Sequence, residues 1–103
     1  MPGKLLKRLE QLNTKDCLWM YILRILHEKE THAYMLRSEI KKRFGFTPGT
    51  VTAYRVIYYL VSKGLVSKRA EGRRKVYSIT ERGKEELKKA VNFYKKQAKE
   101  LYF

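Results

Sequence analysis

Apolar and polar residues recur at helical spacing in a central stretch of the chain, residues 50–63. One face of the predicted helix is apolar and is formed by Ala53, Ile57 and Leu60, with Val56 and Val61 beside them. The opposite face is polar and carries Thr52, Arg55, Tyr59 and Ser62. Gly64 follows the last turn, where a residue in the left-handed conformation ends many helices. The pattern predicts an amphipathic helix with hydroxyls and a guanidinium on its outer face.

The residues after this helix predict a short β-hairpin. Residues 65–70 and 75–79 have the composition of two strands, and residues 71–74 form the turn between them. Cations gather at the turn and on the adjoining strands: Lys68, Arg73, Arg74 and Lys75. A helix with a polar outer face, followed directly by a basic hairpin, is the plan of a winged helix. The expected fold class is mainly α with a small β-hairpin wing.

The charge of the chain indicates the kind of partner. Its 103 residues suffice for one domain with a modest core, and they carry a formal net charge of +14. Self-repulsion of this size favours an anionic partner, for which nucleic acid is the first choice and an anionic membrane surface the rival. No apolar run approaches the ~20 residues that span a bilayer, so no membrane segment is expected.

Cysteine and amide content give the expected compartment and source. The one cysteine, Cys17, cannot form an internal disulfide, which fits a reducing cytoplasm. If the partner is DNA, we expect the protein to be associated with the nucleoid. Gln and Asn are scarce beside Lys and Glu, a bias that leans towards a thermophile.

The side chains offer no catalytic chemistry. His27 and His32 have no Cys or carboxylate at metal-ligand spacing, and no Gly-rich phosphate loop is present. We therefore expect no catalytic, cofactor or metal site and no enzyme activity.

Two helices are predicted in the first 28 residues. Leucines at helical spacing in residues 4–12 predict either a strap packed on the domain or a basic arm on DNA; they are Leu5, Leu6, Leu9 and Leu12. Asn13 and Thr14 resemble the start of a second helix that runs to about Glu28. This helix is apolar nearly all round, so we expect a second subunit to supply part of its cover. Trp19 would lie at that junction, either packed there or lining a ligand pocket.

A further helix is predicted from His32 to Phe44, with Thr31 as its cap. Its apolar stripe consists of Ala33, Leu36, Ile40 and Phe44. Gly45 ends it, and residues 47–50 form the turn to the central helix. Two helices joined by a short Gly/Pro turn, the second with a polar outer face, have helix-turn-helix order.

The last helix is predicted from Thr80, a capping residue, to about Tyr102. Apolar residues four and three positions apart form a heptad seam of Leu87, Val91, Tyr94, Ala98 and Leu101. We interpret the seam as a dimer contact, the alternative being that it packs only on its own domain. Residues 1–79 would then form the winged-helix domain with its short N-terminal helix, and residues 80–103 a C-terminal dimerisation helix of the same compact domain.

Several motifs resemble the PadR family of winged-helix transcriptional regulators. His32-Ala33-Tyr34 is similar to the family's His-Gly-Tyr, with alanine in place of glycine, and Pro48-Gly49-Thr50 is similar to its turn. Residues 54–60 resemble its Tyr-Arg-Ala-Leu-x-x-Leu, and residues 73–83 resemble its Arg-Arg-Lys-Tyr-Tyr-x-Leu-Thr-x-x-Gly wing. The resemblance covers about half of the chain. It implies a homodimer joined through the last helix with help from the first long helix, usually a repressor, in some members responsive to a small hydrophobic ligand.

The expected partner is double-stranded DNA, bound by a homodimer on a pseudo-palindromic site. Arg55 is the candidate for reading guanine, because its fork can bond O6 and N7 together. Thr50 and Thr52, at the helix N-terminus, suit phosphates or base edges. The phosphate candidates are Tyr34, Lys41, Tyr54, Tyr58, Tyr59 and Lys68, with Arg73, Arg74 and Lys75 at the wing; we expect one of the helix tyrosines to pack inward.

Three other functions fit the sequence. The first is a chromatin-like architectural DNA-binding protein of the same fold, and the second is a ribosomal or other RNA-binding protein. The third is a partner-binding module whose charge serves solubility.

Overall fold

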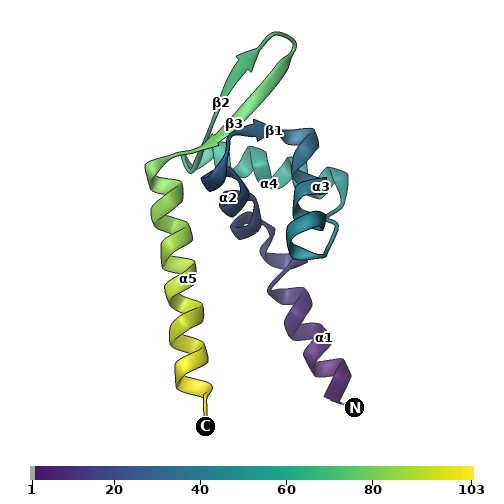
Figure 1. The fold of residues 1–103 in the computed structure, drawn as a ribbon, viewed down its shortest axis with the longest axis vertical. Coiled ribbons are helices and arrows are strands. Elements are labelled where there is room, and N and C mark those ends of the chain that lie inside the picture. The colour runs from purple at the N-terminus through teal and green to yellow at the C-terminus, as the bar shows by residue number, and fades with distance from the viewer. Residues whose placement is uncertain (1) are drawn as a thin grey trace.

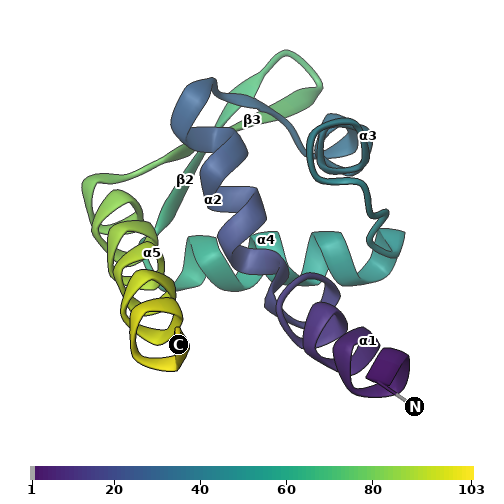
Figure 2. The same ribbon diagram turned by 60° about the horizontal axis from the view of Figure 1, so that its bottom comes forward.

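Three helices and a small sheet share the core of the protein. The computed structural model describes residues 2–103. Helices α2 (Leu18–Glu28), α3 (Ala33–Phe44) and α4 (Thr50–Ser62) pack together, and Figure 2 shows α2 between α3 and α5. The most deeply buried side chains are Ile22, Leu23, Leu36, Ile40, Ile57, Leu60 and Val66. The helical members of this set lie on the apolar faces that the sequence periodicity predicts.

A three-stranded antiparallel sheet completes the domain. Its strands are β1 (Thr31–His32), β2 (Val66–Glu71) and β3 (Arg74–Ile79), in the order β1-β3-β2. β2 and β3 form the predicted hairpin, but Glu71 and Arg74 pair, so only Gly72 and Arg73 remain in the turn. Gly72 has a φ of +63°, which a tight hairpin turn needs and glycine adopts without strain. The mainly α fold with a hairpin wing is therefore confirmed (Figure 1).

Strand β1 corrects one expectation from the sequence. Thr31 and His32 do not cap or begin a helix but pair with Tyr77 and Val76 of β3. Helix α3 then begins at Ala33 without a side-chain cap. A strand of two residues has no periodicity, and its partner lies far away in the chain, so local pattern favours the wrong assignment.

Asn13 and Thr14 end the first helix instead of starting the second. Helix α1 covers Pro2–Leu12, and the side chains of Asn13 and Thr14 donate to the Leu9 and Glu10 carbonyls, each at 2.7 Å. A short 3-10 turn, η1 (Lys15–Cys17), follows without a side-chain cap. Such side chains can bond to carbonyls behind them as well as to amides ahead, which the sequence pattern does not distinguish. Helix α2 therefore begins at Leu18.

Helix α5 (Glu81–Leu101) is anchored at its first turn. Thr80 caps it as predicted, with Oγ1 accepting a hydrogen bond from the Gly83 amide at 3.1 Å and donating one to the Gly64 carbonyl at 2.7 Å. A Cβ on Gly83 would collide with the Leu65 carbonyl, so glycine allows the helix to approach the chain between α4 and β2 closely. The start of α5 is thereby fixed against the end of α4.

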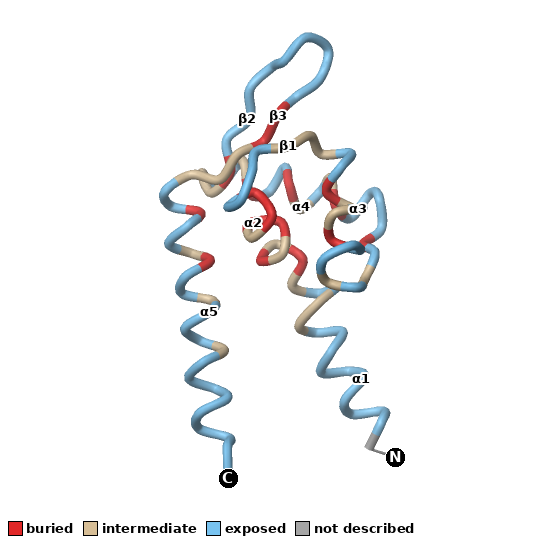
Figure 3. The backbone as a smooth tube through the Cα atoms, viewed as in Figure 1, coloured by how far each residue is buried: buried red, intermediate tan, exposed pale blue. Residues whose placement is uncertain are grey.

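Both terminal helices leave the domain on the side opposite the hairpin. The molecule is 52 Å along its longest axis, with the hairpin at one end and the ends of α1 and α5 at the other (Figure 1). Figure 3 shows both helices exposed over most of their length. The α1 leucines are exposed, Leu5 to 76%, so the interpretation of this helix as a strap packed on the domain is wrong. No helix within residues 2–103 is long and apolar enough to cross a membrane.

The α1–α2 junction is tied to two other elements through Asn13. The Tyr21 hydroxyl donates to the Asn13 carbonyl, and the Tyr94 hydroxyl of α5 donates to Asn13 Oδ1, both at 2.6 Å. The Tyr21 ring packs edge-on against Phe44 and Phe46, with centroids 4.9 and 5.0 Å away. Burial raises the pKa of both tyrosine hydroxyls. These contacts set the direction in which α1 leaves the domain.

Helix α2 is covered mainly by its own chain. Six of its residues are buried there: Leu18, Met20, Ile22, Leu23, Ile25 and Leu26. Trp19 packs against this core but remains half-buried. A second subunit would therefore need to cover α2 only near Trp19.

Candidate nucleic-acid interface

Helix α4 presents one face away from the core. Ala53, Ile57 and Leu60 are buried, whereas Arg55 and Thr52 are exposed, as the sequence predicts. Val51 is 70% exposed and lies one turn before Arg55 on this outer face. Val51 is not among the residues predicted for the site, because it has no hydrogen-bonding group, although its position four residues before Arg55 marks the same face.

The start of α4 is held by a contact from α3. Arg37 Nε donates to the Pro48 carbonyl at 2.7 Å, which fixes the turn before the helix. Gly49 is the N-cap residue and provides no side-chain capping bond, while Thr50 and Thr52 are exposed in the first turn. The first amides of α4 therefore face outward as a site where an anion is favourable.

The two faces of the hairpin carry different charges. Lys68 and Lys75 share a sheet face with the buried Tyr77, because Lys68 pairs with Tyr77 and side chains alternate along a strand. Tyr77 lies next to α4: burial raises the pKa of its hydroxyl, and the nearby Tyr58 and Tyr54 phenols raise it further. Both lysines thus project from the hairpin face that meets α4.

On the opposite hairpin face, Arg69 is engaged in an ion pair. Its guanidinium bonds both Glu30 oxygens at 2.6 and 2.7 Å. The hydrogen bond from Arg69 lowers the pKa of the Glu30 carboxyl. A cavity of about 380 Å³ on this side is lined by four carboxylates, those of Glu28, Glu30, Glu39 and Glu71. These four acidic side chains thus lie on the side of the hairpin away from α4.

A bracket of side chains from β1, α3 and β3 fixes the hairpin to the start of α3. Arg74 Nη1 donates to the Tyr34 hydroxyl at 2.9 Å, and its guanidinium lies over the Tyr34 ring, 5.2 Å from the centroid. The Tyr34 ring stacks on His32 at 5.5 Å. His32 Nδ1 lies 3.2 Å from the Lys75 carbonyl and must carry the proton, since a carbonyl only accepts. Two predicted phosphate ligands, Tyr34 and Arg74, therefore contact each other.

A concave surface forms where α4, the start of α3 and the hairpin meet. This cavity of about 230 Å³ is lined by the predicted site residues Tyr34, Tyr54, Tyr58, Arg73, Arg74 and Lys75. It also includes the buried Tyr77 of β3. Of the helix tyrosines, one of which we expected to pack inward, Tyr54 is half-buried and Tyr58 and Tyr59 are exposed. Lys41 lies apart from this cavity, in the last turn of α3. Tyr59 does not line the cavity either, and its ring contacts Lys63. Arg55 and the two threonines lie on the adjoining outer face of α4.

The electrostatic character of this surface is uniform. Between Glu39 and Glu71 the sequence contains no acidic residue, and that segment includes all of α4 and β2 up to its last position. No carboxylate lines the 230 Å³ cavity. This long gap between acidic residues is visible in the sequence itself and marks the same surface. The surface is suited to a polyanion.

The predicted dimer seam is divided between two environments. Leu87 is buried against its own domain, and Tyr94 is half-buried through its contacts with the α1–α2 junction. Val91 is 43% and Leu101 77% exposed, and Ala98 is exposed as well. The seam therefore continues beyond the part of α5 that the domain itself covers.

The ligating side chains of the protein are dispersed. Within residues 2–103, no group of three or more His, Cys, Asp or Glu lies close enough together to hold a metal ion. Cys17 is half-buried beside Tyr21 and Tyr94.

Comparison with solved structures places the fold among known regulators. A PadR family transcriptional regulator from Eggerthella lenta superposes with a TM-score of 0.80 at 19% identity, covering 96% of this chain and 90% of that one. The winged-helix DNA-binding protein F93 from STIV has a TM-score of 0.69 at 23% identity, covering 80% and 90%. Bacillus subtilis PadR in complex with operator DNA has a TM-score of 0.66 at 25% identity, covering 76% of this chain and 48% of that one.

Comparison of the sequence itself identifies the family. No curated protein sequence matches the chain significantly. The profile of the transcriptional regulator PadR-like family matches residues 22–89, which include most of the core, α4 and the complete hairpin. This chain therefore belongs to the PadR-like family of transcriptional regulators.

Proposed function

We propose that the protein is a sequence-specific double-stranded DNA-binding regulator that acts as a homodimeric repressor. The observation that carries the proposal is the surface on which the outer face of α4 meets the hairpin, with arginines, lysines and tyrosines and no carboxylate between them. A helix fits the major groove of B-DNA, and the flexible cations of a hairpin fit phosphates or the minor groove.

Base recognition is assigned to the exposed face of α4. Arg55 is positioned on this face without an ion pair within the described residues, so its guanidinium is free to bond guanine O6 and N7. Val51, one turn earlier, offers an apolar surface for a thymine methyl group. These two side chains together would give the protein its sequence preference.

Phosphate contacts are assigned to the surface around α4. Thr50, Thr52 and the free amides at the start of α4 would bind one phosphate, as helix N-termini do. On the hairpin, the candidates are Lys68, Arg73, Arg74 and Lys75, and the hydroxyls of Tyr54, Tyr58 and Tyr59 would add hydrogen bonds from α4. Lys41 would reach the backbone from the end of α3. These contacts supply affinity and register without reading the sequence.

A homodimer would form through α5. Its exposed apolar residues, among them Val91 and Leu101, continue the seam beyond the domain, and the exposed leucines of α1 lie at the same end of the molecule. A second copy that covers both helices would remove this apolar surface from water. Two recognition helices would then enter successive major grooves about 34 Å apart on a pseudo-palindromic site. Binding at a promoter would block access of the polymerase.

A small hydrophobic effector would bind between α2 and α5. An apolar cavity of about 180 Å³ lies there, and Met20, Tyr21 and Phe44 line it together with Leu87, Val91 and Tyr94 of the seam. Because seam residues form one wall, a ligand in this cavity would alter the relation between the two subunits and hence between the two recognition helices.

The decisive experiment is selection of bound duplexes from a random pool, with the mass of the free protein measured in parallel. Enrichment of one two-fold symmetric motif by a dimer is the expected result. Binding without an enriched motif would indicate an architectural DNA-binding protein, and preference for structured RNA over duplex DNA in competition would indicate an RNA-binding protein. Either of these outcomes, or a monomer, would overturn the proposal as stated.

A further inference from the structure

A second basic surface lies between α2 and α5, away from α4 and the hairpin. A groove of about 470 Å³ separates the two helices, and five basic side chains line it: Arg24, His27, Lys84, Lys88 and Lys95. Leu87, Val91 and Asn92 complete the lining, so no carboxylate contributes to it. This surface is named the α2–α5 groove.

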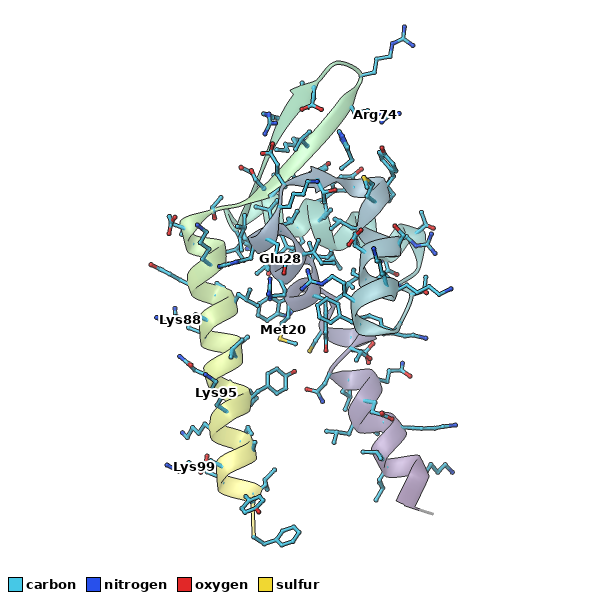
Figure 4. The ribbon with its side chains drawn as sticks, viewed as in Figure 1. Met20, Glu28, Arg74, Lys88, Lys95 and Lys99 are labelled. Carbon is cyan, nitrogen blue, oxygen red and sulfur yellow. The ribbon has the colours of Figure 1, made fainter. Side chains whose placement is uncertain are left out.

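The lysines of the α2–α5 groove belong to a longer row on α5. Lys84, Lys88, Lys95 and Lys99 are four, seven and four residues apart, which places them on one side of the helix. Figure 4 shows Lys88, Lys95 and Lys99 along the same side of α5. From first to last the row extends over roughly 22 Å of helix. It continues beyond the groove along the part of α5 that leaves the domain.

Most of this charge is not neutralised within the chain. Lys84 and Arg24 each make one exposed ion pair, with Glu81 at 3.2 Å and with Glu28 at 3.3 Å. Lys88, Lys95 and Lys99 have no ion pair among the described residues. Arg24 Nη1 is buried and makes no hydrogen bond. The Arg24 side chain as a whole is 43% exposed, so its guanidinium adds a positive charge to the lining of the groove.

The length of the row identifies the anion as a polymer. A DNA strand places one phosphate every 3.4 Å of its axis, so a row of this length matches several phosphates, whereas a small anion would engage only one or two of the lysines. Flexible lysines without a base-reading surface suit the phosphate backbone. Leu87 and Val91 of the lining belong to the seam that the proposed dimer covers, whereas the lysine row lies beside the seam on α5. A second copy of α5 placed on the lysine row itself would bring like-charged lysines together.

The α2–α5 groove shares no lining residue with the cavity between α4 and the hairpin. The lysine row leads from the groove towards the C-terminal end of α5, which lies at the opposite end of the 52 Å axis from the hairpin tip (Figure 1). We propose that the α2–α5 groove binds the sugar–phosphate backbone of a second DNA duplex, so that the protein bridges two duplexes. The inference rests on the proposed function for the first duplex, which occupies α4 and the hairpin.

The test is a two-step capture with the full chain. The selected duplex is immobilised and saturated with protein, unbound protein is washed away, and a labelled duplex of unrelated sequence is added. Wild-type protein is expected to retain the labelled duplex, and the Lys88→Gln/Lys95→Gln variant to lose up to about 60-fold in affinity for it at 0.1 M salt, as the loss of two phosphate contacts implies. Binding to the immobilised duplex should be unchanged.

The matched control is Lys89→Gln/Lys96→Gln. It removes the same charge from the same helix, one position further along, where the side chains do not line the groove. Equal loss of capture in both variants would overturn the proposal in favour of a diffuse charge effect, and so would retention of structured RNA in place of the second duplex. If the protein does not bind the immobilised duplex, the proposed function is wrong. If the wild-type protein binds that duplex but does not retain the labelled one, the proposal for the α2–α5 groove is wrong.

Discussion

Arg74 of the hairpin and Tyr34 of α3 make a double contact, a 2.9 Å hydrogen bond from Nη1 to the hydroxyl and a guanidinium stacked 5.2 Å from the ring centroid. The contact holds an arginine in place before any DNA arrives, which lowers the conformational entropy that binding must remove. Tyr34 therefore has two roles: it holds the hairpin in place through Arg74, and it is a candidate phosphate ligand. The two roles of Tyr34 can be separated by substitution.

We expect Tyr34→Phe to weaken binding to all duplexes by about fivefold, because the loss of one hydrogen bond costs about 1 kcal/mol. Sequence preference should not change. The measurement is a fluorescence anisotropy titration against the selected and an unrelated duplex, with Tyr102→Phe at the far end of α5 as the control. If Tyr34 acts through Arg74, its effect should vanish in an Arg74→Ala background; additive effects would assign it a phosphate of its own.

Arg55 and Arg73 should differ in kind when replaced by alanine. Arg55→Ala should cost about 1–3 kcal/mol on the selected duplex and relax the preference at one base position. Arg73→Ala should weaken all sequences alike and reduce the salt slope by about 2, because the dimer loses one phosphate contact in each subunit, from about −7 for a dimer that contacts eight phosphates. Affinity and selected motif are measured at several salt concentrations. If the Arg55→Ala variant selects the same motif as the wild type, the assignment of α4 to the major groove is wrong.

Gly83→Ala should destabilise the fold by about 3 kcal/mol, because the new Cβ would overlap the Leu65 carbonyl and lie 2.7 Å from Ile79 Cγ1. Urea unfolding followed by circular dichroism measures the change. Gly3→Ala is the paired control, since a Cβ there meets nothing within 4 Å and alanine favours a helix. A Gly83→Ala protein as stable as the wild type would mean that α5 can move away from β2 at little cost.

The Glu30 carboxyl should titrate below its usual pKa of 4.5, because Arg69 bonds its charged form. A lowered pKa stabilises the folded state at pH values above 4.5, and this contribution is lost as the pH falls through the pKa of the folded protein. Carbon-detected NMR of the side-chain carboxyls follows the titration. Arg69→Gln should return the Glu30 midpoint towards 4.5, whereas Lys99→Gln, which removes a distant charge, should leave it unchanged. An identical midpoint in the Arg69 variant would show that the pair does not persist in solution.

Leu101→Asp should weaken the proposed dimer at least tenfold, because a carboxylate at an exposed seam position must lose water on association. Leu101 is 77% exposed in the single chain, so the fold of the subunit should not suffer. Sedimentation velocity over a range of concentrations gives the dissociation constant. Asn92→Asp adds the same charge to α5 away from the seam and should change little. Equal dissociation constants for the two variants would exclude the end of α5 from the interface.

Long periodic elements could be predicted from the sequence because their own residues determine them. The apolar stripe of α4, the Thr80 cap of α5 and the hairpin strands all follow local rules, and the structure contains each of them. β1 could not be predicted in this way, because its two residues become a strand only through pairing with β3. Asn13 and Thr14 have side chains that suit either of two adjacent helices, and only the tertiary structure decides between them.

The candidate interface shows the same division. Arg55 and the hairpin cations follow from helical and strand periodicity, and the structure places them on exposed faces. The link between Tyr34 and Arg74 joins residues that are far apart in the chain and has no local signature. Val51 has no such signature either, because a valine in an amphipathic helix resembles a core residue and only the structure shows that it is exposed.

The turn at Gly72 and Arg73 restricts how this hairpin can change in evolution. Lys68 and Arg69 are neighbours in β2 but emerge on opposite sides of the sheet, one beside Tyr77 and the other bonded to Glu30. Insertion of a single residue between the base of the strand and Lys68 would exchange the two sides, turning an arginine towards α4 and a lysine towards the carboxylates. Relatives with a longer or shorter hairpin should therefore differ from this one by an even number of residues in each strand. An insertion of an odd number should occur only with a bulge that restores the register.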